Sequence, residues 1–421
     1  MNVEKLKQHY DLVVVGGGMV GASFACALTK AIKEGEAAGN DFTILVVEAV
    51  APKSDIPLQQ SFDARSTALS YGSSKIFQTM GLWNQLKSVV SAIEKIHVSD
   101  KGRLGSSQLN CEDYGVDALG YVIENSKLGV VLNDVMEKSS SIELACPAKI
   151  SQIKPQQEGM SLQLETESGS HQLDASLVVL ADGGRSPICS QLGISHSVEP
   201  YGQHALIANI AFEKPHEGTA YERFTDTGPL AVLPLESIEQ AEGVGALNRG
   251  SLVWTLSPAQ AAEYKTMEEA ELRRLLQERF GNRLGTIQHI GERFIYPLSL
   301  SLSKEQVRPG LVLLGNVAHA IHPVAGQGLN LALRDTKVLV EVLTQAIVNN
   351  KAVGEMSVLQ EYLQRQQADQ SRTISFTHYM TQLFSSNNSA KVLFRKFGLF
   401  AIDLIPGFRK SLAEQAMGLS K

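Results

Sequence analysis

Three glycines and one glutamate in the first fifty residues have the spacing of a dinucleotide-binding site. Gly16, Gly18 and Gly21 form a GxGxxG pattern, and Glu48 follows 27 residues after the third glycine. In such a site the first glycine permits a tight turn, the second lets the backbone approach a pyrophosphate, and the third lets a helix pack closely on a strand. The acidic residue accepts hydrogen bonds from the adenosine ribose. The pattern therefore predicts that the chain binds a dinucleotide.

The segments around these residues have the patterns of the elements that would position them. Residues Leu12 to Val15 form an apolar run typical of a strand buried on both faces of a parallel sheet. The stretch from Met19 to about Lys33 is rich in Ala and Leu, which predicts a helix whose N-terminus faces the anion. FTILVVE predicts a second strand that ends in Glu48, and the long spacing before it fits a loop insertion, EGEAAGN.

Two later segments could complete the site. LVVLADGGRS predicts a strand that runs into Asp182 and Gly183, and LVLLGNVAHAIHPVAGQGLNLALRD predicts another strand that runs into Gly315 and Asn316. The carboxyl ends of parallel strands are where open α/β sheets bind ligands. We therefore expect both segments to lie beside the glycine turn.

The loop of the last segment could lie against a planar ring. Pro323 stops regular structure, while Gly326 and Gly328 allow the backbone to come close to a flat ligand. The helix expected from Leu329 onward would direct its positive N-terminal end toward that ligand. Reduced flavin carries negative charge at its pyrimidine edge, so this dipole would favour it. On the first sixty residues alone, a nicotinamide dehydrogenase stays open as an alternative.

The three segments, in this order and separation, resemble the FAD-dependent aromatic hydroxylases related to para-hydroxybenzoate hydroxylase. The resemblance covers most of the chain. It is closest to the ubiquinone-biosynthesis hydroxylases, in particular the 2-octaprenyl-6-methoxyphenol hydroxylases, through the stretches HVSDKG, EDYG, LIANI, ERFTDTGPLAVLPL and GNVAHAIHPVAGQGLNL. It implies an α/β fold: a Rossmann-like FAD-binding domain with an inserted, mainly antiparallel β-sheet substrate domain and C-terminal helices.

The resemblance also implies which residues contact FAD. Together with the loop glycines, the expected contacts are Gly16, Gly18, Gly21, Glu48, Asp182, Gly183, Gly315, Asn316, Gly326 and Gly328. Arg65, in the stretch FDARSTALS, would lie near the cofactor phosphates or the flavin. The family usually has Asp where this chain has Asn316, so a charged contact with the ribityl chain becomes a neutral amide.

The same resemblance implies a monooxygenase. NAD(P)H would dock transiently and reduce FAD, O₂ would add to form a C4a-hydroperoxyflavin, and its distal oxygen would pass to the ring of a polyprenylated phenol. His319 and His322 are candidates to take a proton from the phenol, and we name His322 and Pro323 as candidate catalytic residues. A flavin-dependent reductase of the same fold and a non-catalytic flavin-binding subunit stay open as alternatives. A disulfide reductase would need a CxxC pair, which the chain lacks.

Composition limits the other classes of function. The chain has 421 residues and a formal net charge of -6, so it lacks the basic field that binding to nucleic acid requires. Its four cysteines stand apart, without histidines at metal-ligand spacing, which predicts reduced thiols and no metal site. The N-terminus lacks the pattern of a secretory signal, so we expect a cytoplasmic protein.

Alternating stretches between Ser190 and about Tyr296, such as HALIANIAF and GSLVWTL, predict a mainly antiparallel sheet. We expect a discontinuous FAD-binding domain of residues 1-75, 100-189 and 297-345, a substrate domain of residues 76-99 and 190-296, and a C-terminal helical region of residues 346-421. The tail from Lys391 mixes apolar and basic residues. We expect it to pack on its own domain, with peripheral contact to the inner membrane or to other ubiquinone-biosynthesis proteins as alternatives.

Overall fold

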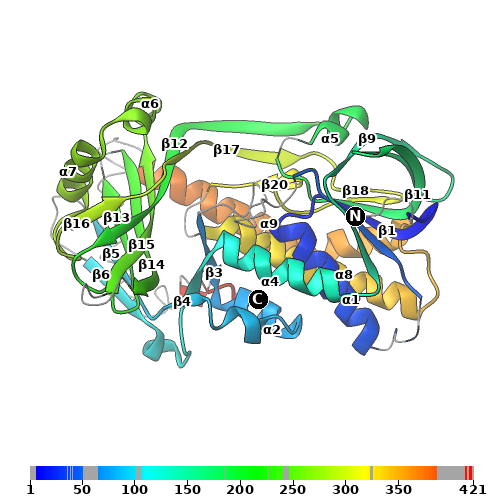
Figure 1. The fold of residues 1–421 in the computed structure, drawn as a ribbon, viewed down its shortest axis with the longest axis horizontal. Helices are drawn as coiled ribbons and strands as arrows, with labels where there is room; N and C mark the ends of the chain where they lie inside the picture. The colour runs from blue at the N-terminus through cyan, green and yellow to red at the C-terminus, as the bar shows by residue number, and fades with distance from the viewer. Residues whose placement is uncertain are drawn as a thin grey trace.

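The computed structural model describes residues 6–35, 37, 39, 41–50, 65–100, 106–184, 186–225, 227–239, 246–322, 326–385, 413–414 and 417–419. Their strands form three sheets, of eight, nine and three strands. Figure 1 shows the two larger sheets in different parts of the molecule, joined by the long strands β12 and β17.

The eight-stranded sheet contains the strand that leads into the glycine turn. Five of its strands run parallel in the order β19-β11-β1-β2-β8, while β18 and the pair β9 and β10 are antiparallel additions. The bounds are β1 His9–Val15, β2 Ile44–Val47, β8 Ile142–Ala145, β9 Ala148–Pro155, β10 Met160–Thr166, β11 Gly169–Leu180, β18 Val307–Arg308 and β19 Leu311–Leu313. The strands predicted at Leu12 to Val15 and in FTILVVE are β1 and β2.

Two apolar cores cover the faces of this sheet. Leu12 and Val14 of β1 belong to a core shared with α1 (Met19–Glu34), α4 (Asn125–Lys138) and α8 (Gln327–Val348). Val13 and Val15 belong to a second core, shared with β9, β10 and α5 (Pro187–Gln191). The apolar run in β1 is unbroken because both of its faces are buried, as the sequence predicts.

The nine-stranded sheet is mainly antiparallel, in the order β20-β17-β12-β15-β14-β13-β5-β6, with β16 paired to β12. Its strands are β5 Lys95–Asp100, β6 Ser106–Asn110, β12 His196–Phe212, β13 Thr219–Thr225, β14 Gly228–Glu239, β15 Ala246–Leu256, β16 Ile287–Ile290, β17 Phe294–Ser303 and β20 His319–Ala320. Only the pair β5 and β13 is parallel among the strand pairs of this sheet that the structure describes. This confirms the predicted antiparallel sheet.

Two helices cover one face of the nine-stranded sheet. The helices α6 (Pro258–Thr266) and α7 (Glu269–Phe280) lie on the side away from the rest of the molecule, at the left of Figure 1. Their buried side chains share a core with alternate residues of β12, β14 and β15, including Trp254. We call the face under these helices the outer face and the opposite face the inner face.

A three-stranded sheet, β3-β7-β4, contacts the nine-stranded sheet along β14. Its strands are β3 Ser66–Ser70, β4 Val90–Ile93 and β7 Gly120–Glu124. Between β3 and β4, helices α2 (Tyr71–Thr79) and α3 (Trp83–Leu86) contribute Ile76, Phe77 and Leu86 to the core of α1 and α8.

The packing differs from the predicted domain boundaries in two places. Residues 76–86 pack with the helices of the parallel sheet because their apolar side chains complete that core. Residues 106–110, expected in the FAD-binding domain, form β6 at the edge of the nine-stranded sheet because β6 pairs with β5. The rest of the domain division stays a prediction.

The C-terminal region begins with a long helix, α9 (Met356–Ser385), which packs on α8. Most of the tail lies outside the described residues. Ala413 and Met417 are buried, and the Met417 carbonyl accepts a hydrogen bond of 2.7 Å from the Gly72 backbone N–H. Among the helices that the structure describes, none combines the length and the apolar character needed to cross a membrane.

Candidate cofactor and substrate site

The turn after β1 has the geometry that its glycines predict. Gly16 has φ +102°, and a Cβ atom there would lie 2.6 Å from the carbonyl oxygen of Ala181. A Cβ atom on Gly21 would lie 2.0 Å from the carbonyl oxygen of Gly16, so helix α1 can approach the turn only without a side chain. Gly18 is the N-cap of α1. The positive end of this helix therefore meets the turn at the edge of the sheet.

Glu48 follows β2 directly and is fixed beside this turn. One carboxylate oxygen accepts a 2.8 Å hydrogen bond from the Gly17 N–H, and the other accepts a 3.0 Å bond from the Val50 N–H. The residue is half-buried. The structure thus places an acceptor at the end of the second strand, where a ribose contact is predicted, and the long loop before β2 does not displace it.

The two downstream segments reach the same edge of the sheet. Asp182 and Gly183 follow β11, and Gly315 and Asn316 follow β19, the neighbouring parallel strand. Burial raises the pKa of Asp182 above its usual range. Gly315 has φ +75° and packs against Val20 of α1, whereas Asn316 is exposed.

These positions fit the ADP half of FAD. Backbone without side chains, a helix N-terminus and a fixed carboxylate meet at one edge, which is the donor and acceptor set that a pyrophosphate and a ribose require. The structure therefore brings together the predicted residues of the three segments. Which atoms of FAD each residue contacts stays a prediction.

Arg65 lies between β3 and the nine-stranded sheet. Its guanidinium donates a hydrogen bond to the hydroxyl of Tyr296 on β17 and lies 4.9 Å from the centre of that ring and 5.7 Å from the centre of Phe294. Ser66, the next residue, contacts Asn209 of β12 through a 3.4 Å hydrogen bond between its hydroxyl and the amide oxygen. The start of β3 thus faces the inner face of the sheet.

The loop before α8 also packs on β3. Gly326 has φ +61°, and a Cβ atom there would lie 2.9 Å from Cβ of Ala68. Gly328 has no atom within 4 Å of the place where its Cβ would stand, among the described residues. Pro323, a predicted catalytic residue, lies outside the described residues.

Asn330 fixes this loop, and the sequence did not single it out. Its amide nitrogen donates to the carbonyls of Ala68 (2.9 Å) and Gly326 (2.7 Å). Its amide oxygen accepts from the Ser70 N–H (2.8 Å) and the Ser73 hydroxyl (2.7 Å). The sequence feature that could have identified Asn330 is a polar residue on the buried side of an otherwise apolar helix. Its role is to tie the loop, β3 and α2 together.

The two candidate histidines are both buried. His319 Nε2 lies 2.5 Å from a carboxylate oxygen of Asp335 on α8. The ring of His322 meets Tyr201 edge-on at 5.2 Å, and burial lowers its pKa to about 4. His322 is therefore neutral at pH 7, and a base with so low a pKa accepts a phenol proton poorly. Its catalytic role stays a prediction.

The inner face of the nine-stranded sheet is only partly covered. On β12 and β15 the outer-face residues Leu206, Leu252 and Trp254 are buried, whereas their inner-face neighbours Ile207 and Val253 are half-buried. Further half-buried side chains on the inner face are Asn209, Ala231, Leu233, Phe294 and Tyr296. A mainly apolar surface of this kind suits an apolar ring.

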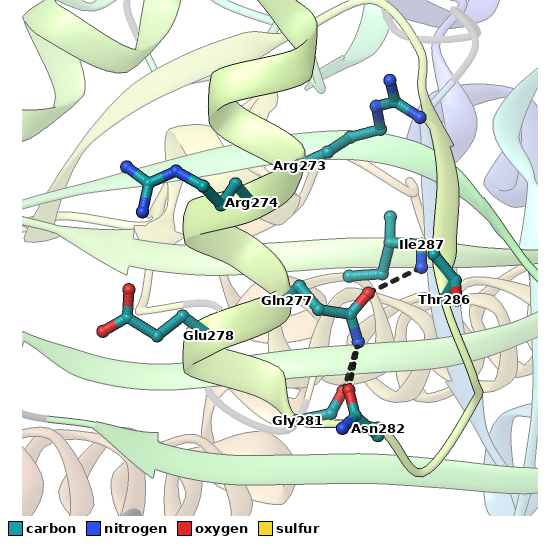
Figure 2. A pocket seen from close by; sticks show the side chains of 8 residues that line it. All are labelled: Arg273, Arg274, Gln277, Glu278, Gly281, Asn282, Thr286 and Ile287. Carbon is teal, nitrogen blue, oxygen red and sulfur yellow. Dashed lines mark hydrogen bonds between the residues drawn. The ribbon is translucent and has the colours of Figure 1, made fainter.

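A separate cavity of about 620 Å³ lies on the outer side of the sheet, between α7 and the loop before β16. Figure 2 shows Gln277 reaching across it. The side chain donates to the carbonyls of Gly281 and Gly285 and accepts a 2.7 Å bond from the Ile287 N–H, so its polar atoms hold the loop. The cavity lies on the opposite side of the sheet from Arg65 and Tyr296.

Comparison with known proteins shows the family to which the chain belongs. Residues 9–376 match the family model described as FAD binding domain. The chain is 32% identical to "Ubiquinone hydroxylase UbiL" of Rhodospirillum rubrum over 98% of this chain and 90% of that protein. It is 28% identical to the "3-demethoxyubiquinol 3-hydroxylase" of Escherichia coli, over 98% of this chain and 99% of that protein.

Among solved structures, the p-nitrophenol 4-monooxygenase PnpA of Pseudomonas putida has a similar fold. The TM-score is 0.76 at 18% identity, and the match covers 98% of this chain and 99% of that one. This likeness confirms the predicted fold, with its FAD-binding part, its sheets and its C-terminal helices. By the family match and the overall identity to its relatives, the chain belongs to the FAD-binding-domain family and is an FAD-dependent aromatic hydroxylase.

Proposed function

We propose that the chain hydroxylates the aromatic ring of a polyprenylated phenol in ubiquinone biosynthesis, with O₂ as the oxygen source and NAD(P)H as a transient reductant. The observation that carries this proposal is the half-buried, mainly apolar inner face beside Arg65 and β3. The names of the relatives from Rhodospirillum rubrum and Escherichia coli support the ubiquinone pathway. A prenylated ring is apolar, so such a face suits it.

In the reaction, the protein itself binds the cofactor and the substrate and shields the ring from water. Bound FAD supplies the activation of O₂. The glycine turn, Glu48 and the N-terminus of α1 would hold its ADP half, and the Asn330 hydrogen bonds fix the loop that precedes α8. The inner face orients the ring and keeps water away from it.

Labelled oxygen tests this function directly. The FAD-loaded protein is incubated with ¹⁸O₂, NAD(P)H and a synthetic short-chain prenylphenol, and the product is analysed by mass spectrometry and for ring position. Incorporation of one ¹⁸O atom into the ring is expected. Oxidation of NAD(P)H without label in the product would favour a flavin-dependent reductase. Failure to oxidise NAD(P)H with FAD bound would favour a non-catalytic flavin-binding subunit.

A polyprenylated substrate resides in a membrane, so we also propose a cytoplasmic enzyme that contacts the inner membrane peripherally or associates with other ubiquinone-biosynthesis proteins. Basic and apolar residues in the tail from Lys391 support contact with an anionic surface. Co-sedimentation with anionic vesicles, compared between the full chain and a variant with Lys391, Arg395 and Lys396 changed to Gln, tests it. Equal sedimentation of both proteins would contradict this use of the tail.

A further inference from the structure

Glu222 lies in the middle of β13, and the strand register fixes the face on which its side chain stands. Its neighbour Tyr221 packs edge-on against Phe280 of α7 at 5.7 Å and is therefore on the outer face. Because successive residues of a strand point to opposite faces, Glu222 is on the inner face.

The same face carries the residues that contact Arg65 and Ser66. Glu222 pairs with Ala231, Ala231 with Val253, Val253 with Ile207, and Ile207 with Phe294, so these side chains form one row across five strands. Tyr296, two residues from Phe294 on the same face, is the hydrogen-bond partner of Arg65. Glu222 thus stands at one end of this row and the Arg65 contact at the other, with apolar side chains between them.

The surroundings of Glu222 are apolar. Its inner-face neighbours on the adjoining strands are Val98 and Ala231, and along its own strand they are Ala220 and Phe224. Neither a hydrogen bond nor an ion pair joins Glu222 to any other residue in the part of the chain that the structure describes. Burial alone raises the pKa of its carboxyl to about 7. Such a group costs stability and is a candidate for a functional role.

We propose that Glu222 is the residue that binds the hydroxyl group of the phenolic ring and accepts its proton. This inference rests on the proposed function, since it needs a phenol on the inner face. In the step, the O–H bond of the phenol breaks and a new O–H bond forms on the carboxylate. The ring is left as a phenolate, which is richer in electrons and more reactive toward an electrophilic oxygen.

The proton affinity of Glu222 suits this step better than that of His322. An ordinary carboxylate accepts a phenol proton poorly because its pKa lies far below that of a phenol, about 10. Desolvation brings the pKa of Glu222 closer to that of a phenol, whereas it moves the pKa of the buried His322 imidazole further from that of a phenol.

The test uses the variant Glu222→Gln, which keeps the shape of the side chain but cannot accept a proton. Glu271→Gln is the matched control, because Glu271 is exposed on α7, at the outer side of the same sheet. With FAD, NAD(P)H and a short-chain prenylphenol, we expect Glu222→Gln to lower kcat about 10²-fold or more with a small change in KM. Glu222→Asp should restore part of the activity, and Glu271→Gln should match the unmodified chain.

A second readout does not depend on turnover. The ultraviolet difference spectrum of the bound prenylphenol reports whether its hydroxyl donates a hydrogen bond to a carboxylate, because such a bond shifts the phenol band to longer wavelength. We expect this shift at pH 8 for the unmodified chain and for Glu271→Gln, and a smaller shift for Glu222→Gln. A Glu222→Gln variant that hydroxylates at the normal rate and keeps the full shift would overturn the role of Glu222. Absence of ¹⁸O from the product of the unmodified chain, with the shift still present, would overturn the proposed function alone.

Discussion

Two half-buried carboxylates, one beside the inner face and one on it, have opposite surroundings. Near the three-stranded sheet, Glu124 at the end of β7 forms two hydrogen bonds, of 3.1 and 3.2 Å, with the guanidinium of Arg249 on β15. In the row that leads to Arg65, Glu222 has no partner among the described residues. Both carboxylates are largely withdrawn from water, but only one has its charge compensated.

The pKa values of the two groups differ accordingly. Burial would raise the pKa of Glu124, but the hydrogen bonds and charge of Arg249 and Lys127 outweigh it and hold the pKa below the usual range. For Glu222 burial is the only influence, and the pKa rises to about 7. A pair such as Glu124 and Arg249 joins two parts of a structure, whereas an unpaired carboxyl in an apolar row is available to a ligand.

The largest expected effect comes from breaking the pair. Glu124→Ala leaves the guanidinium of Arg249, whose side chain is only 13% exposed, without this carboxylate, and we expect a loss of about 3 kcal/mol in the free energy of unfolding. Urea unfolding at pH 7 measures it. The control Asp134→Ala removes an exposed partner of Lys138 on α4 and should cost less than about 1 kcal/mol. Equal losses in the two variants would show that the Glu124 pair does not hold the sheets together.

The same pair should make stability fall in acid. The pKa of Glu124 is lower in the folded chain than the ordinary value of 4.5, so its contribution is complete above pH 4.5 and is lost as the pH falls through the folded pKa. The difference in unfolding free energy between the unmodified chain and Glu124→Ala should therefore shrink from pH 6 to pH 3. A difference that stays constant over this range would contradict the lowered pKa.

For the carboxyl of Glu222, stability should depend on pH in the opposite direction. The pKa of Glu222 is raised from 4.5 to about 7, so the chain has its full stability from this group below pH 4.5 and loses it as the pH rises through 7. Glu222→Gln removes that loss. We expect the variant to be more stable by on the order of 2–3 kcal/mol at pH 8, with little difference at pH 4. Urea titrations at both pH values measure the change, and a variant less stable at pH 8 would contradict an uncompensated carboxylate.

The sequence predicted the glycine turn and the ends of the parallel strands because the signals for both are local. Gly16, Gly21 and Glu48 act through backbone geometry and through their position at the ends of apolar strands, and both can be recognised from a short segment. The later strands ending at Asp182 and Gly315 were found in the same way. Each of these predictions needs only the end of a strand and the residue that follows it.

The inner face could not be predicted in this way. Glu222 lies in ERFTDT, a stretch without clear apolar alternation, and its face follows from the pairing of β13 with β14 and β5. Asn330 gains its role from residues about 260 positions earlier in the chain. The strands β5 and β6 join a sheet whose other strands begin about 90 residues later, and the sequence near residue 100 does not show this pairing. Such contacts depend on pairing between segments far apart in the chain, which local sequence patterns do not show.

The smallest expected effect concerns the other end of the row, where Arg65 contacts Tyr296. Tyr296→Phe removes the hydroxyl that accepts the hydrogen bond but keeps the ring under the guanidinium. We expect a loss of about 0.5–1.5 kcal/mol in the free energy of unfolding, because one hydrogen bond is lost and the cation–π contact remains. Tyr296→Leu removes both contacts and should cost more. If the two variants were equally destabilised, the ring of Tyr296 would add nothing to the contribution of its hydroxyl at this contact.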